Sequence, residues 1–94
     1  ELEKTRQLVY AAAARADAGE AEALLAVLAC KAAAADTAVH VTNEAMTLLG
    51  GIGYRENSKL ARLLRDARAG HVMAPTTDML KTWVGRALLR LPLV

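Results

Sequence analysis

The feature that most constrains this chain is a long run of small and apolar residues between positions 20 and 49. Residues three and four apart recur in it without a break: Leu25, Leu28, Ala32, Ala35, Val39, Thr42, Met46 and Leu49. This spacing places them on one side of an α-helix, as in a helix packed lengthwise on a partner. About 30 helical residues extend roughly 45 Å. The sequence therefore predicts a long central helix whose alanines allow a partner to approach closely.

Shorter helices are expected on either side of this segment. Residues 1–18 form one, which ends at Gly19 and turns these residues inward: Leu2, Val9, Ala12, Ala13 and Ala16. Ser58 caps a second over residues 59–71, with inward residues Leu60, Leu63, Leu64 and Ala67. The last helix follows the break at Pro75, ends before Pro92 and places these residues on one side: Leu80, Trp83, Val84, Ala87 and Leu91. The fold class predicted is all-α.

Composition narrows the class of protein further. Of the 94 residues, 54% are hydrophobic with alanine the commonest and no Phe, and the net charge is +2. Lys and Arg are spread among carboxylates and aromatics are few, which argues against nucleic-acid binding. Cys30 is the only cysteine, so no intramolecular disulfide is expected. We expect no membrane span, because no uninterrupted apolar run reaches about 18–20 residues. The chain is expected to be cytoplasmic, and Glu1 suggests that it begins inside a longer protein.

Three stretches could carry chemistry. The first is Thr47–Tyr54, where Gly50, Gly51 and Gly53 form an expected loop whose amides could approach a phosphate, although a helix cap followed by a turn has the same pattern. The second is Arg65-Asp66-Ala67-Arg68, for which a salt-bridged helix face is the simpler interpretation. The third is Met73–Asp78, either a proline break with a helix cap or a polar ligand site at a helix start.

Metal and nucleophile chemistry find little support in the sequence. His40 and His71 lack partners at metal-ligand spacing, and no metal is expected. One cysteine and two unmatched histidines give no Ser/His/Asp or Cys/His set.

The order of the motifs is more informative than any one of them. A long helix, Gly50-Gly51-Ile52-Gly53-Tyr54, Leu63-Leu64-Arg65-Asp66-Ala67-Arg68 and a threonine-containing turn follow one another. This order resembles the C-terminal domain of acyl-CoA dehydrogenases, and the resemblance covers nearly the whole chain. It implies a four-helix bundle that forms the family's third domain and much of its oligomer core. Residues 1–94 would then be an incomplete form of that domain, with the N-terminal and middle domains absent.

The resemblance also implies FAD, held non-covalently between domains and across a subunit boundary. The helix end before the glycines reaches the pyrophosphate of a neighbouring subunit's FAD, a role that falls here to Thr47, Leu48, Gly50 and Gly51. The family usually has Gln where Thr47 stands, and the shorter Thr side chain weakens that contact. Thr76 would contact the flavin of its own subunit, with Asp78 beside it.

The largest departure from the family pattern is Ala74. The family commonly reads Tyr-Glu-Gly-Thr where this chain reads Met73-Ala74-Pro75-Thr76, and that glutamate removes the α-proton of the acyl thioester. Alanine cannot accept a proton, and losing a positioned base typically costs a factor of about 10²–10⁴. Three explanations are open: a base supplied from upstream, a non-catalytic subunit in a mixed oligomer, or a different flavin reaction.

Two functions follow from these expectations. The first is part of a FAD-dependent dehydrogenase that desaturates acyl thioesters of CoA or a carrier protein, with these 94 residues inactive alone. The second is a helical module that serves only oligomer assembly. Self-association is expected in either case, as a homo- or hetero-oligomer, because apolar helix faces would otherwise stay exposed.

Overall fold

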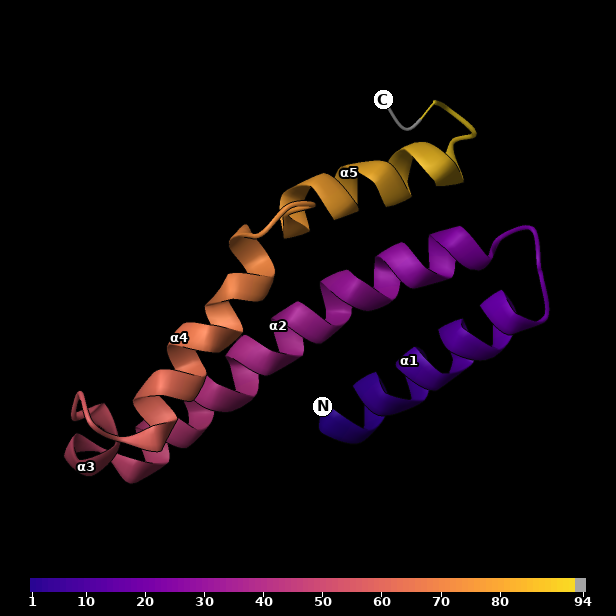
Figure 1. Cartoon of the computed structure of the whole chain (residues 1–94). Coiled ribbons are helices and arrows are strands. Elements are labelled where there is room, and N and C mark those ends of the chain that lie inside the picture. The colour runs from indigo at the N-terminus through magenta and orange to yellow at the C-terminus, as the bar shows by residue number, and fades with distance from the viewer. Residues whose placement is uncertain (93–94) are drawn as a thin grey trace.

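The computed structural model describes residues 1–92, and within them the chain forms five helices and no strand (Figure 1). These are α1 (Leu2–Asp17), α2 (Ala23–Leu49), α3 (Gly51–Tyr54), α4 (Lys59–Val72) and α5 (Thr77–Leu88). The predicted all-α class and the order of the long helices are confirmed. The expected loop Gly50–Tyr54 is wrong in one respect, because four of its residues form the single turn of α3.

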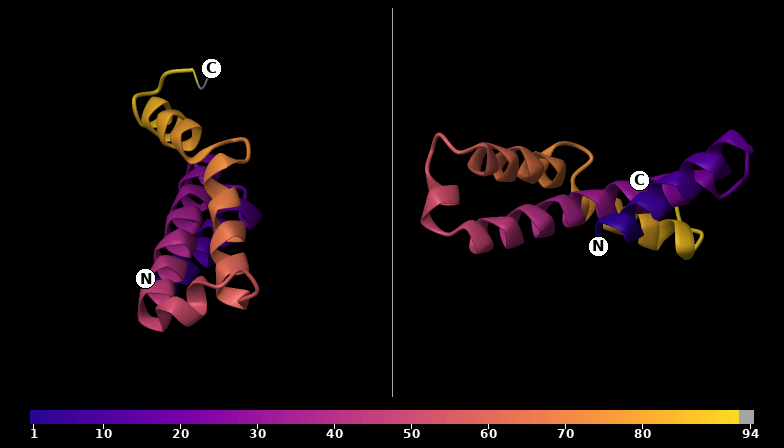
Figure 2. Two further views of the ribbon diagram at one scale, coloured as in Figure 1. Left: turned by 90° about the vertical axis from the view of Figure 1, so that its left-hand side faces the viewer. Right: turned by 90° about the horizontal axis from the view of Figure 1, so that it is seen from below.

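Helix α2 is the central helix, and the other long helices all pack on it. In Figures 1 and 2, α1 runs back along the N-terminal half of α2, while α4 runs back along its C-terminal half. Helix α5 continues from α4 and lies over the N-terminal half of α2, so that α4 and α5 pack mainly on α2 and little on each other. The molecule is accordingly elongated, 47 × 26 × 16 Å. The four long helices do not lie side by side over one length, so they do not form a closed four-helix bundle (Figure 1).

The predicted seam of α2 faces these partners along most of its length. Ala32 and Ala35 are buried, and five others are half-buried: Leu25, Leu28, Val39, Thr42 and Met46. Leu49 is the exception at 54% exposure. It lies in the last turn of α2, where the chain reverses through α3 and no long helix covers it.

Small residues face each other where α2 and α4 pack together. A Cβ placed on Gly70 of α4 would lie 3.2 Å from the Cβ of Ala35, which is closer than ordinary van der Waals contact, and Ala35 is buried. Replacing Ala35 with leucine is therefore expected to lower the free energy of unfolding by about 1–3 kcal/mol, because overpacking forces the two helices apart. Urea unfolding would measure this change. The same replacement at exposed Ala14 of α1 is the control and should change stability by less than about 0.5 kcal/mol.

Glycine and hydroxyl residues end and begin the helices as the sequence predicted. Gly19 lies two residues after the end of α1, and its φ of +70° allows the amides of Gly19 and Glu20 to donate to the carbonyls of Ala16 and Arg15, each at 3.1 Å. A hydrogen bond to Glu20 and its charge raise the pKa of the Arg15 guanidinium at this end. Ser58 caps α4 by accepting from the amide of Ala61 at 2.9 Å.

The turn between α2 and α4 needs two of its glycines for different reasons. Gly50 has φ +63° and ψ −142°, a conformation that side chains strongly disfavour. Gly53 is buried, and a Cβ there would lie 3.0 Å from the Cβ of Leu49 and 3.3 Å from Leu60. Ser58 also donates to the Gly53 carbonyl at 2.5 Å. This packing holds α3 against the start of α4.

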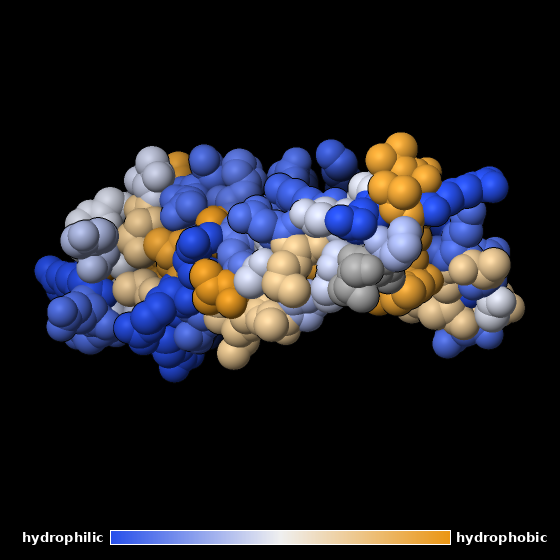
Figure 3. Space-filling model, turned by 90° about the horizontal axis from the view of Figure 1, so that it is seen from above, coloured by the Kyte–Doolittle hydropathy of each residue, from blue (hydrophilic) through white to orange (hydrophobic). Residues whose placement is uncertain are grey.

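The inward faces predicted for the shorter helices are only partly covered. On α1, Ala12 is buried, whereas four residues are exposed: Leu2, Val9, Ala13 and Ala16. Leu63 and Leu91 are also exposed, at 41% and 49%. Figure 3 shows apolar patches among polar side chains on the face seen from above. Within residues 1–92 the large side chain of Leu80 is the one that is fully buried, so the core is thin.

One expectation about α2 needs correction. Among the described helices, α2 is the one that is long and apolar enough to cross a membrane by length and composition. The sequence expectation counted only uninterrupted apolar residues, whereas a window that tolerates one or two charges passes the test. A single such helix is weak evidence, because the core helix of a soluble protein passes too. Lys31 and Asp36, in the middle of α2, make polar contacts with α4, α5 and the turn between them.

Candidate functional site

The turn between α4 and α5 lies against the middle of α2. It contains Ala74 and Pro75, and the ammonium group of Lys31 on α2 donates a hydrogen bond to the Pro75 carbonyl at 2.7 Å. Thr76 ends the turn as the N-cap of α5, and its hydroxyl accepts from the amide of Met79 at 3.2 Å. The predicted cap at Thr76 is confirmed.

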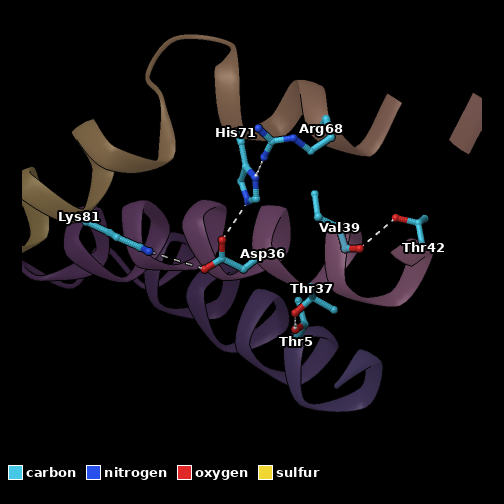
Figure 4. Close-up of polar contacts among 8 residues, drawn as sticks. All are labelled: Thr5, Asp36, Thr37, Val39, Thr42, Arg68, His71 and Lys81. Atoms are coloured by element: carbon cyan, nitrogen blue, oxygen red, sulfur yellow. Dashed lines mark hydrogen bonds and ion pairs between the residues drawn. The ribbon is translucent and has the colours of Figure 1, made fainter. Parts of the chain in front are cut away.

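A polar network links both sides of this turn to α2 (Figure 4). Asp36 accepts from Nε2 of His71, near the end of α4, at 2.9 Å, and its other oxygen lies 4.0 Å from Nζ of Lys81 on α5. Nη1 of Arg68 contacts Nδ1 of His71. Because a guanidinium can only donate, both contacts are satisfied together when Nδ1 accepts from Arg68 and Nε2–H donates to Asp36. Both nitrogens of His71 are therefore engaged.

A surface pocket of about 330 Å³ opens beside this network. Its lining combines opposite charges with one hydroxyl residue: Asp36, Arg68, His71, Val72, Thr77, Asp78 and Lys81. Thr77 is 7% exposed. Among the buried side-chain nitrogen and oxygen atoms of residues 1–92, its hydroxyl oxygen is the one without a hydrogen-bond partner. An unpaired buried hydroxyl costs free energy, so Thr77 is a candidate contact for a ligand or another part of the protein.

The residues predicted around the glycines lie elsewhere. Thr47 donates its hydroxyl proton to the carbonyl of Asn43 at 3.2 Å, within its own helix, and Leu48 is 87% exposed. A Cβ on Gly50 or Gly51 would meet nothing within 4 Å. This end of α2 therefore presents an open surface.

The structure does not bring the two predicted groups together. Lys31, which touches the turn before Thr76, and Thr47 are 16 residues apart on α2, which corresponds to about 24 Å along the helix. Figure 1 shows α3 at one end of the molecule and the α4–α5 turn near its middle. Within one chain, Thr47–Gly51 and Thr76–Asp78 form two separate surfaces.

The helix face expected at Arg65-Asp66-Ala67-Arg68 is not salt-bridged in the described part of the chain. Residues one or two apart on a helix point in different directions, so Asp66 cannot meet either arginine. Arg68 turns instead to His71.

Sequence reasoning missed the contacts that Lys31, Asp36 and His71 make at the turn. Thr77 lies in the predicted stretch Met73–Asp78, but the burial of its unpaired hydroxyl was not predicted. Asp36 and His71 are 35 residues apart and Lys31 and Pro75 are 44 apart, so no local spacing reveals these pairs. The one available signal was a charge in the middle of an otherwise apolar helix, which needs a partner when it is partly buried.

A comparison with known proteins identifies the family of this chain. Residues 1–89 match the family model described as acyl-CoA dehydrogenase, C-terminal domain. The chain therefore belongs to the acyl-CoA dehydrogenase family, as the order of its motifs suggested.

Individual relatives agree with this assignment. A probable acyl-CoA dehydrogenase fadE25 of Mycobacterium leprae is 39% identical over 89 residues, which cover 95% of this chain and 23% of that protein. The short-chain specific acyl-CoA dehydrogenase of Megasphaera elsdenii is 38% identical over 90 residues, 96% of this chain and 23% of that protein. A 3-sulfinopropanoyl-CoA desulfinase of Paraburkholderia xenovorans is 36% identical over 89 residues, 95% of this chain and 22% of that protein.

The chain spans about a quarter of the length of these relatives. No solved structure gave a significant match.

Proposed function

We propose that this chain is the C-terminal helical part of a FAD-dependent acyl-thioester dehydrogenase, in which it contributes to FAD binding and oligomer assembly. The observation that carries the proposal is the family match over residues 1–89. The substrate would be an acyl thioester of CoA or a carrier protein, desaturated between the α and β carbons in the cytoplasm. The remaining three quarters of the parent's length would supply the other domains.

The two separate surfaces suit FAD bound across a subunit boundary. The proposal assigns Thr47, Leu48, Gly50 and Gly51 to the FAD of a neighbouring subunit, and Thr76 and Asp78 to the FAD of their own. One FAD need not touch both groups, so their separation of about 24 Å along α2 is compatible with these roles. The open space at Gly50 and Gly51 leaves the backbone amides accessible.

The orphaned hydroxyl of Thr77 supports a polar group beside the turn. Thr76 uses one lone pair of its hydroxyl oxygen to cap α5, whereas the whole hydroxyl of Thr77 is without a partner and can both donate and accept. The residues present thus suit a heterocycle with hydrogen-bonding edges. When bound, FAD supplies the hydride acceptor, and the part of this chain is to position it.

A base that removes the α-proton of the substrate would have to lie outside the turn. Ala74 has no basic group, and both ring nitrogens of nearby His71 are already hydrogen-bonded. A base from an upstream helix is the arrangement we favour. Two alternatives remain: a non-catalytic subunit beside a complete one, and a different flavin reaction. A relative named as a desulfinase, not a dehydrogenase, is the reason to keep a different reaction among the alternatives.

A visible absorption spectrum of the full-length parent tests the proposal. We expect a yellow protein whose flavin band is bleached when a panel of acyl thioesters is added. A yellow protein that no thioester bleaches would instead support a different flavin reaction or a missing catalytic subunit. A parent that stays colourless after FAD is supplied would contradict the proposal and leave only an assembly module.

A further inference from the structure

We propose that Lys31 is a positioning residue, which holds the α4–α5 turn in the place from which Thr76 and Thr77 reach the cofactor. The cofactor part of this inference rests on the proposed function, whereas the anchoring of the turn stands on the geometry alone. Lys31 and Pro75 are 44 residues apart, yet Nζ of Lys31 lies 2.7 Å from the Pro75 carbonyl oxygen. This distance is that of a strong, charge-assisted hydrogen bond.

The turn has few other polar ties. Its preceding residue, Met73, bonds back into α4 through the Ala69 carbonyl, and Thr76 accepts from the amides of α5. Within residues 1–92, neither Ala74 nor Pro75 makes a backbone–backbone hydrogen bond in the turn. Pro75 also has no N–H to donate. The bond from Lys31 is therefore the hydrogen bond that joins the turn itself to α2, in addition to the packing of α4 and α5 on that helix.

The Pro75 carbonyl is the polar partner of the Lys31 ammonium group among the described residues. Lys31 takes part in no salt bridge among residues 1–92, although α2 also carries Asp36 and Glu44. The side chain is half-buried, so an ammonium without a partner there would be costly. A lysine whose only role was to solvate the helix surface would point its charge into water.

Asp36 extends the same support to both flanks of the turn. It lies five residues after Lys31 on α2 and contacts His71 before the turn and Lys81 after it. Its side chain is 51% exposed, and exposed ion pairs contribute little. The partly buried bond from Lys31 is the stronger of the two ties, and the proposal therefore concerns Lys31.

The consequence for function is geometric. Thr76 is the first residue after the carbonyl that Lys31 holds, and Thr77, with its unpaired hydroxyl, is the second. If the turn shifts, the hydroxyls of both residues and the start of α5 shift with it. Displacements of about 1 Å are enough to weaken a positioned contact severely.

The test uses the full-length parent with three variants. Lys31→Met keeps the aliphatic stem and removes the donor, Lys31→Arg restores a donor, and Lys59→Met makes the same change at an exposed lysine at the start of α4. Hydrogen–deuterium exchange of the amides in residues 74–80 is measured together with FAD content and the visible spectrum. Loss of a hydrogen bond to a charged group corresponds to about a tenfold or larger change in an opening equilibrium.

We expect Lys31→Met to raise exchange of these amides at least tenfold while α1 exchanges as before, and to weaken FAD binding or shift the flavin band. Lys31→Arg should recover most of both effects, and Lys59→Met should show neither. Unchanged exchange in Lys31→Met would overturn the anchoring, and equal loosening of all helices would reduce Lys31 to a general stabilising role.

The outcomes separate this inference from the proposed function. Faster exchange in Lys31→Met of a parent that holds no flavin would support the anchoring and contradict the proposed function. Faster exchange in a yellow parent whose flavin is unaffected would overturn the positioning role, although the protein would still be a flavoprotein.

Discussion

Replacing Leu80 with alanine is expected to lower the free energy of unfolding by about 2–5 kcal/mol. Leu80 is 0% exposed and is the one large side chain that is fully buried in residues 1–92. It lies in the first turns of α5, so its loss leaves a cavity where α5 meets α2. A domain of this size is typically stable by only about 5–14 kcal/mol, and a thin core places this one toward the lower end.

Urea unfolding followed by helical circular dichroism would measure the change. The matched control is Leu88→Ala on the same helix, where the side chain is 68% exposed and the cost should stay below about 0.5 kcal/mol. Fluorescence of Trp83, also on α5, reports whether this helix detaches before the others. Equal effects of the two replacements would show that α5 is not held to α2 through Leu80.

Helix positions and caps were predictable from the sequence because their causes are local. The three-and-four spacing of α2, the serine and threonine caps at Ser58 and Thr76, and the glycine at position 19 each act within a few residues. The single turn of α3 was not predictable in the same way. It depends on the fit of Gly53 against Leu49 and Leu60, which is a tertiary contact.

Burial was predicted less well than secondary structure. The spacing that puts Leu2 and Val9 on one face of α1 says which residues could be covered, not what covers them. In residues 1–92, α1 packs on α2 alone, so its other apolar residues stay exposed. Periodicity therefore identified the covered face of α2 along most of its length, but on α1 only Ala12 of the five predicted residues is buried.

The candidate site shows the same limit. The residues assigned from motif order, from Thr47 to Gly51 and at Thr76 and Asp78, remain predictions about a cofactor. The structure adds where they lie and that they form two surfaces. Lys31 and Asp36 entered only through contacts between distant parts of the chain, which a single sequence does not display.

Replacing Gly51 with aspartate is expected to remove FAD from the full-length parent without unfolding this chain. A Cβ at Gly51 would meet nothing within 4 Å, and the residue begins α3, where a negative charge is tolerated. If the proposed contact with the neighbouring subunit's FAD pyrophosphate is correct, the new carboxylate would face a phosphate. Like charges about 4 Å apart repel by about 1–4 kcal/mol near a protein surface.

That repulsion corresponds to a loss of affinity between about fivefold and several hundredfold. Flavin content after gel filtration and FAD titration of the apoprotein would measure it. Gly85→Asp is the matched control, because it introduces the same charge at a second glycine whose Cβ would meet nothing within 4 Å, on α5. Gly51→Ala separates the added Cβ from the added charge. If Gly51→Asp keeps its flavin as fully as Gly85→Asp does, Gly51 does not face a phosphate, and the role of this end of α2 would be assembly alone.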